Sequence, residues 1–293
     1  MAADLTGCRP EYRDEILCPM CLERIARSDI KILTKEHLLS KSLGGNAITL
    51  TCKPCNNVFG HKAQGHLAAL LKTNESLRGG GEVRGRFTVF GQTVPVGVRV
   101  RPSAGLSITA LGGSPNSFDA IHVGMRTEAR SKWSMQIRFP YNPAKASTAI
   151  ARAAYLVAFH QFGYRYILAQ PVNTLRAEIV SAMDRHSERL CLLTGTTKGR
   201  PAGTGNEPES VIIPVLMETD QRFLIVMLKF RQNRNYWMFS ALPYPEQSVH
   251  SMFQDLAQAV QQIGMCDISM SGDENGKITA QFVRRTAVGD APN

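Results

Sequence analysis

Residues 15–60 of the chain, EILCPMCLERIARSDIKILTKEHLLSKSLGGNAITLTCKPCNNVFG, contain the pattern that decides how its N-terminal part folds. Two C-x-x-C pairs, Cys18/Cys21 and Cys52/Cys55, are separated by 30 residues, and four thiolates suit tetrahedral zinc. One metal held by both pairs would tie together a unit too small to have a core of its own. Two unrelated buried pairs are the alternative, which is disfavoured because both flank the same strand–loop–strand stretch. The spacing therefore predicts structural Zn²⁺.

The segment between the cysteine pairs carries residue types that suit phosphodiester hydrolysis. Short strands are predicted at residues 31–39 and 47–51, with Glu36 and His37 near the end of the first. Adjacent strand residues point to opposite sides, so these two side chains can act separately. A histidine exchanges protons near neutral pH, and a carboxylate with the amide oxygen of Asn56 suits Mg²⁺ or Mn²⁺. The pattern is typical of a base and a metal site beside the zinc.

This stretch resembles the HNH endonucleases with a ββα-metal fold and a four-cysteine zinc site. The resemblance rests on three pieces taken together: C-P-M-C, E-H-L-L-S-K-S-L-G-G-N and C-K-P-C-N-N-V-F-G. They are also similar to the zinc-stapled core of phage junction-resolving endonucleases. The resemblance covers residues 15–70. It implies that His37 is the general base, that Asn46 braces the loop carrying this base, and that Glu36 and Asn56 bind the catalytic cation. It assigns the structural zinc to the four cysteines, Cys18, Cys21, Cys52 and Cys55.

The sequence differs from the family pattern in two ways that bear on these roles. The family often has aspartate at the position of Glu36, and the longer side chain would shift the metal. The spacing from Asn46 to Cys52 differs slightly from the commonest pattern. His61 is a further candidate for a contact with the scissile phosphate, although a solvated helix face explains it as well. The same alternatives apply to His66 and, as phosphate contacts, to three lysines, Lys41, Lys53 and Lys62.

Size and composition describe an ordinary globular protein of two domains. The chain has 293 residues, 43% of them hydrophobic and 20% charged. No apolar run is long enough to span a membrane, and the first residues do not resemble a signal peptide, so a cytoplasmic protein is expected. The net charge of +10 favours a polyanionic partner. Its surplus lies in residues 81–165, which hold 11 Lys and Arg against 3 Asp and Glu.

The fold expected from these patterns is α+β, with an HNH module at residues 1–78 and a larger mixed domain at 79–293. Four glycines in residues 77–86 mark the boundary. Strands are predicted at 87–102, 106–111, 133–139, 211–217, 222–230 and 236–242, and helices at 57–74, 142–163, 173–186 and 248–264. Period-2 alternation would put Arg99 and Arg101 on one strand face, as a nucleic-acid track or as a solvated face. The second domain carries no recognisable catalytic motif and is expected to provide recognition, regulation or dimerisation, with a protein partner or a second copy.

The sequence therefore predicts a metal-dependent endonuclease that cleaves DNA, preferred over RNA, by water attack on phosphorus. The resemblance alone suggests a restriction or anti-phage defence role. Two rivals stay open. One is a non-catalytic zinc module that binds nucleic acid or a partner. The other is a nuclease effector that is silent until the C-terminal domain senses a ligand or partner.

Overall fold

The computed structural model describes residues 2–37, 48–76, 81–101, 105–127, 136–200, 210–216, 222–229, 236–264, 266–272 and 278–284. Helices and mainly antiparallel sheets are combined in it, with one parallel strand pair in the largest sheet, which confirms the α+β class. The chain forms two compact units, one of Met1–Gln64 with Pro143–Asn293 and the other of Gly65–Asn142. This division differs from the expected boundary at 78/79. The N-terminal module shares one unit with the C-terminal half because its side chains pack against a helix from that half.

The first unit begins with short elements that surround two hairpins. Strand β1 pairs with β2, and β3 pairs with β4 in the register Glu36↔Thr49. Helix α2 follows β4 without a break, and Pro54 suits its first turn, where a missing N–H costs nothing. The helix expected at 57–74 therefore begins earlier, and a π-helical turn interrupts it at Gly60–Gln64. The bounds are α1 Ala2–Cys8, β1 Glu15–Leu17, β2 Arg24–Ala26, β3 Leu33–His37, β4 Ile48–Cys52 and α2 Lys53–Phe59, with 3-10 turns at Pro10–Tyr12 and Arg27–Ile32.

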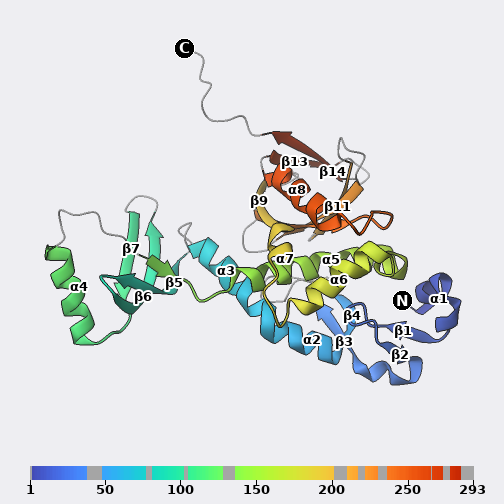
Figure 1. Cartoon of the computed structure of the whole chain (residues 1–293), viewed down its shortest axis with the longest axis horizontal. Coiled ribbons are helices and arrows are strands. Elements are labelled where there is room, and N and C mark those ends of the chain that lie inside the picture. Colours follow the sequence, from blue (N-terminus) through green and yellow to red (C-terminus); the bar gives the residue numbers. More distant parts are fainter. Residues whose placement is uncertain are drawn as a thin grey trace, which may run out of the picture. The chain divides into compact units, whose positions relative to one another are not determined.

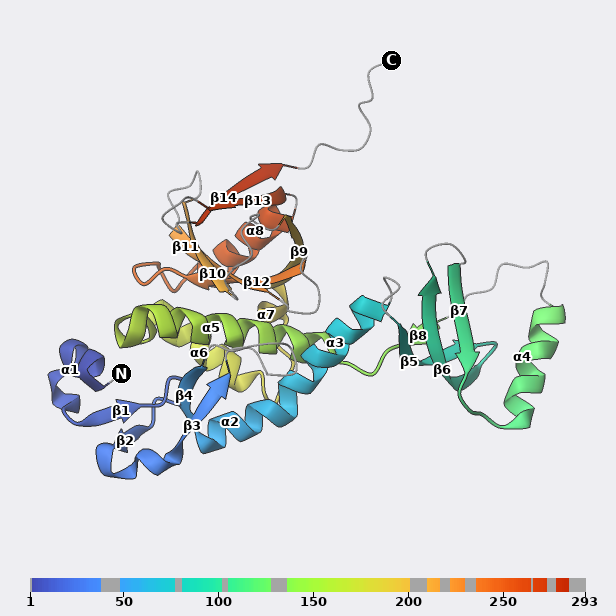
Figure 2. The ribbon, with the colours of Figure 1, turned by 180° about the vertical axis from the view of Figure 1, so that it is seen from behind.

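Helix α5, Pro143–Ile167, is the central element of the first unit and lies between these hairpins and a six-stranded sheet (Figure 1, and from behind in Figure 2). Its Ala-rich middle is buried, and small side chains allow close packing on both sides. Gly163, at φ +67°, kinks the helix near its end. The backbone N–H of Tyr164 then donates to the Asp4 carboxylate at 2.8 Å, joining α5 to α1.

The sheet of the first unit has the order β10-β11-β12-β9-β13-β14. Strand β11 is buried along nearly its whole length, because α5 covers one face of the sheet and α8 packs on the other. Strands β10 to β12 and helices α6 and α8 were expected, whereas β9, β13 and β14 were not. The bounds are α6 Gln170–Ser181, α7 Glu188–Leu192, β9 Thr194–Arg200, β10 Ser210–Leu216, β11 Arg222–Lys229, β12 Tyr236–Pro243, α8 Met252–Gly264, β13 Cys266–Gly272 and β14 Ile278–Arg284.

The second unit is a four-stranded antiparallel sheet, β7-β6-β5-β8, with one helix packed on one face. Phe90 and Gly91, both at positive φ, form the two-residue turn that joins β5 to β6. Ile121 from α4, which was not expected, joins the core formed by Val83, Phe87 and their neighbours. The bounds are α3 Gly65–Glu75, β5 Glu82–Val89, β6 Gln92–Arg101, β7 Gly105–Ala110, α4 Pro115–Thr127 and β8 Gln136–Arg138.

Within the described part of the chain, no helix combines the length and the apolar character needed to cross a membrane.

Candidate functional site

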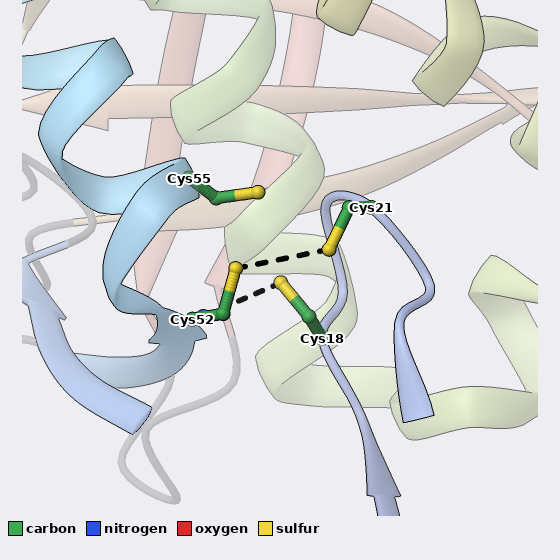
Figure 3. Close-up of side chains that lie close together, drawn as sticks. All are labelled: Cys18, Cys21, Cys52 and Cys55. Atoms are coloured by element: carbon green, nitrogen blue, oxygen red, sulfur yellow. Dashed lines mark hydrogen bonds between the residues drawn. The ribbon is translucent and has the colours of Figure 1, made fainter. Parts of the chain in front are cut away.

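The four predicted cysteines meet at one point in the first unit. Their sulfurs all lie within 4.8 Å of one another, and Cys21 Sγ is 3.7 Å from Cys52 Sγ (Figure 3). A tetrahedron of thiolates at the usual Zn–S distance has edges of about 3.8 Å, so this spacing fits a metal. It is far longer than a disulfide bond, and each of the four is a free thiol. The cluster can therefore hold a metal ion such as zinc, which confirms that part of the prediction.

Each cysteine pair is shaped by its local backbone. The first pair lies on the turn after β1, where Leu22 at φ +59° reverses the chain. The Leu22 N–H donates to Cys18 O at 2.8 Å, and the Cys18 N–H donates to Glu23 O at 3.0 Å. The second pair spans the end of β4 and the first turn of α2, and the Cys52 N–H donates to Cys18 Sγ at 3.4 Å. Two tight turns thus present four sulfurs to a common centre.

The closeness of the sulfurs changes their ionisation. A hydrogen bond with Cys55 lowers the pKa of Cys18 to about 4, whereas burial raises the pKa of Cys21 to about 12. The same interaction with Cys18 raises the pKa of Cys55 well above its ordinary value. Without a metal, the cluster therefore favours one thiolate, and deprotonation of Cys21 and Cys55 is unfavourable. A divalent cation would make this deprotonation favourable, because it neutralises the negative charge of the thiolates.

Helices from the C-terminal half hold the first cysteine turn in place. The Tyr155 hydroxyl on α5 donates to Pro19 O at 2.7 Å, and Arg176 on α6 donates to Met20 O at 2.6 Å. The Tyr164 hydroxyl donates to Leu17 O at 2.6 Å and accepts from the N–H of the same residue at 3.1 Å. These bonds satisfy backbone groups that would otherwise be buried without partners. The first cysteine turn is thus anchored to the helices of the C-terminal half.

Glu36 lies on β3 as expected, but its carboxylate is turned into the interior. Arg152 of α5 donates from its Nη1 to Glu36 Oε1 at 2.8 Å, and the two side chains are only 1% and 2% exposed. Gln64 donates to the same oxygen at 3.3 Å, and the Arg152 guanidinium stacks over the Phe59 ring at 3.8 Å. Glu36 Oε2 is buried and has no hydrogen-bond donor among the described residues. The carboxylate is therefore both ion-paired and half unsatisfied.

Asn56 and His37 lie at the junction of the hairpin and the helix. The Asn56 side-chain amide donates from Nδ2 to Thr34 Oγ1 at 3.0 Å and reaches Lys35 O at 3.5 Å. These bonds tie the first turn of α2 to β3, the strand that ends in Glu36 and His37. His37 itself is half-buried and is the last residue of the strand.

The remaining candidates are less closely associated with this junction. His61 and Lys53 are exposed, and Lys62 forms an ion pair with Asp184. The ring of His66 accepts a hydrogen bond from the Asn142 N–H at 3.1 Å within the second unit. Asn46 and Lys41 lie outside the described residues.

The sequence interpretation did not identify the residues that support the site, chiefly Arg152, Gln64, Tyr155 and Arg176. One signal was present. Arg152 is the only charged residue in the run Ala146–Phe159, where the other positions suit a buried helix, and a charge at such a position indicates a buried partner. Its partner, 116 residues away, could not be named from the pattern.

Comparison with known proteins found no family model, no curated protein and no solved structure that matches this chain.

Proposed function

We propose that the first unit is a metal-dependent endonuclease in which His37 takes a proton from the attacking water. The observation that carries the proposal is the pair of hydrogen bonds from Asn56 to Thr34 and Lys35. They hold an amide side chain beside the strand that ends in His37, and a four-cysteine cluster stabilises the same junction. A general base and a hard-cation ligand on one rigid hairpin–helix unit are what phosphodiester hydrolysis requires.

The orientation of Asn56 supports its role as a ligand. Its Nδ2 is engaged with β3, which leaves the carbonyl oxygen Oδ1 as the atom that would bind a cation. Amide oxygens are among the ligands that Mg²⁺ and Mn²⁺ accept. The bound cation would stabilise the charge that develops on the phosphate and the leaving oxygen. Asn56 would thus contribute to binding and positioning of the cation.

Glu36 fits the proposal through one oxygen. Oε1 stays with Arg152 and Gln64, and we assign the cation to Oε2, which is buried and lacks a donor in the described part of the chain, so a local opening of the structure beside β3 is needed for a cation to reach it. An unsatisfied buried carboxylate oxygen is costly, and a cation contact would satisfy it. Arg152 then serves as a positioning residue, because its short contact holds the carboxylate in one orientation.

The test is cleavage of supercoiled plasmid, linear duplex, single-stranded DNA and RNA by the full chain, with Mg²⁺, with Mn²⁺ and without added divalent metal. His37→Ala should lower the cutting rate by about 10²–10⁴-fold, which is the usual contribution of a general base. Asn56→Ala should require a higher Mg²⁺ concentration for the same rate. The matched control is His186→Ala, an exposed histidine after α6. Zinc content and circular dichroism establish that each variant stays folded.

The outcomes separate the proposal from its rivals. Cutting that survives His37→Ala, or the absence of cutting on every substrate and metal, contradicts the simple nuclease. Zinc-loaded protein that binds nucleic acid without cutting it would favour a non-catalytic zinc module. Cutting that begins only after a cell extract is added, and that still requires His37, would favour a nuclease controlled by a ligand or partner.

A further inference from the structure

One sheet face of the second unit carries arginines, and no helix of the described residues packs on it. Burial alternates along β5, with Val83, Phe87 and Val89 buried and the residues between them more exposed. The buried side faces the core to which α4 contributes. The opposite face presents exposed arginines from three different strands, namely Arg84 and Arg86 on β5, Arg99 on β6 and Arg138 on β8.

The strand register places these arginines close together. Arg86 lies directly opposite Arg138 on β8, and Arg84 lies two residues from Arg86 on the same face. Directly opposite residues have Cβ atoms about 5 Å apart, and two residues along a strand span about 7 Å. The three side chains therefore start from one region of the sheet. These three arginines and Arg99 are called the arginine face.

Few carboxylates balance the positive charge of the arginines on this face in the described structure. The described strands place one carboxylate there, that of Glu82, which is 3.9 Å from Arg99 and opposite it in the register. Glu82 also lies over Gly97, where an added Cβ would come within 2.6 Å of its carboxyl carbon. Glycine at position 97 thus leaves space for the glutamate to lie flat across the sheet. Arg84 and Arg86 have no acidic partner among the described residues.

Like charges directly opposite on a sheet destabilise it, so the pair Arg86–Arg138 has a folding cost that a bound anion would reduce. Hydroxyl groups border the arginines: Thr88 and Thr93, joined by a hydrogen bond of 2.9 Å, and Ser107 opposite Arg99. Guanidinium groups with neighbouring hydroxyls are the usual donors to phosphate oxygens.

We infer that the arginine face binds the phosphate backbone of duplex DNA. The surface is defined by the register and burial of the second unit, whereas the choice of duplex DNA as its occupant rests on the proposed nuclease function. Backbone binding of this kind would be independent of sequence and strongly dependent on salt.

The test measures binding of the full chain to a fluorescent DNA duplex by anisotropy, without added Mg²⁺ or Mn²⁺, over a range of salt concentrations. Each phosphate contact contributes about 0.9 to the slope of log K against log salt. Arg84→Ala with Arg86→Ala should therefore lower the magnitude of the slope by about 1.8 and weaken binding about 60-fold at 0.1 M salt.

Two further variants make the test specific. Arg126→Ala with Arg165→Ala removes the same charge from exposed positions on α4 and α5, and it should leave the slope nearly unchanged. Arg84→Lys with Arg86→Lys keeps the charge and should keep most of the slope. Thermal melting of each variant verifies that the second unit is folded.

Equal losses in the double alanine variant and in the Arg126/Arg165 control would overturn the inference, because the effect would then be one of net charge. Preference for anionic vesicles over duplex DNA would overturn it as well. The nuclease proposal is tested separately. If DNA binding depends on the arginines but no DNA is cut when Mg²⁺ is added, the arginine face is supported and the nuclease proposal is contradicted. If DNA is cut and the double alanine variant binds DNA as well as the original protein, the nuclease proposal is supported and the arginine face is contradicted.

Discussion

The buried pair of Glu36 and Arg152 provides the sharpest test of how the two ends of the first unit are joined. Arg152→Met keeps an unbranched apolar stem close to that of arginine and removes the charge and the donors of the guanidinium. The carboxylate of Glu36 would then lie 2% exposed with Gln64 as its remaining donor in the described structure. Removing one partner of a buried ion pair costs about 3–5 kcal/mol, because a charge stays buried without compensation.

The reverse arm of the experiment replaces both partners. Glu36→Leu with Arg152→Met removes both charges and also the unsatisfied atoms of the pair, which are Glu36 Oε2 and Arg152 Nε and Nη2. Each unsatisfied buried group costs about 1–3 kcal/mol, so the double variant should be about as stable as the original protein or more stable. The two substitutions are therefore expected to be strongly non-additive.

The assay is urea unfolding of the zinc-loaded protein followed by circular dichroism, with the single and double variants compared in one buffer. Arg165→Met, at an exposed position on the same helix, serves as the control and should change the free energy of unfolding by less than about 0.5 kcal/mol. A loss below about 1 kcal/mol for Arg152→Met would refute the reasoning, since a buried and uncompensated carboxylate cannot be that inexpensive.

Two other predictions follow from the metal cluster and from the kink in α5. Because the pKa of Cys21 is raised to about 12 and that of Cys55 is raised further, both are protonated near neutral pH in the metal-free protein. Zinc binding should release one proton from each and strengthen as the pH rises; calorimetric enthalpies that do not depend on the buffer would contradict this. Gly163→Ala should cost about 1–3 kcal/mol in thermal unfolding, because its φ of +67° is unfavourable and its Cβ would clash with Asp4. Gln161→Ala on the same helix should cost little, and equal losses would show that the backbone angle is irrelevant.

Several elements could be predicted from the sequence because their patterns are local. Strand β11 is an uninterrupted apolar run, and α5 has a proline at its first position and a long apolar stripe. Helix α4 was missed because Gly124 and polar residues weaken its periodicity, and its packing on β6 stabilises it instead. Strand β9, TGTTKGR, has the composition of a loop, and its backbone pairing with β12 makes it a strand.

The candidate site divides in the same way. The sequence alone is enough to group Cys18, Cys21, Cys52 and Cys55 as one set that could hold a metal, because two short turns can present four sulfurs wherever the intervening hairpin closes. It also placed Glu36 and His37 on a strand and Asn56 after the last cysteine.

The surroundings of these residues depend on contacts between distant parts of the chain. Glu36 is turned inward because α5, more than a hundred residues away in the sequence, offers Arg152 at the point where β3 packs. The arginines of the second unit come from three strands whose register no local pattern specifies. The physical reason is the same in both cases. A side chain's own spacing sets which face of its element it occupies, but its charge partner is set by long-range packing, which depends on the whole chain.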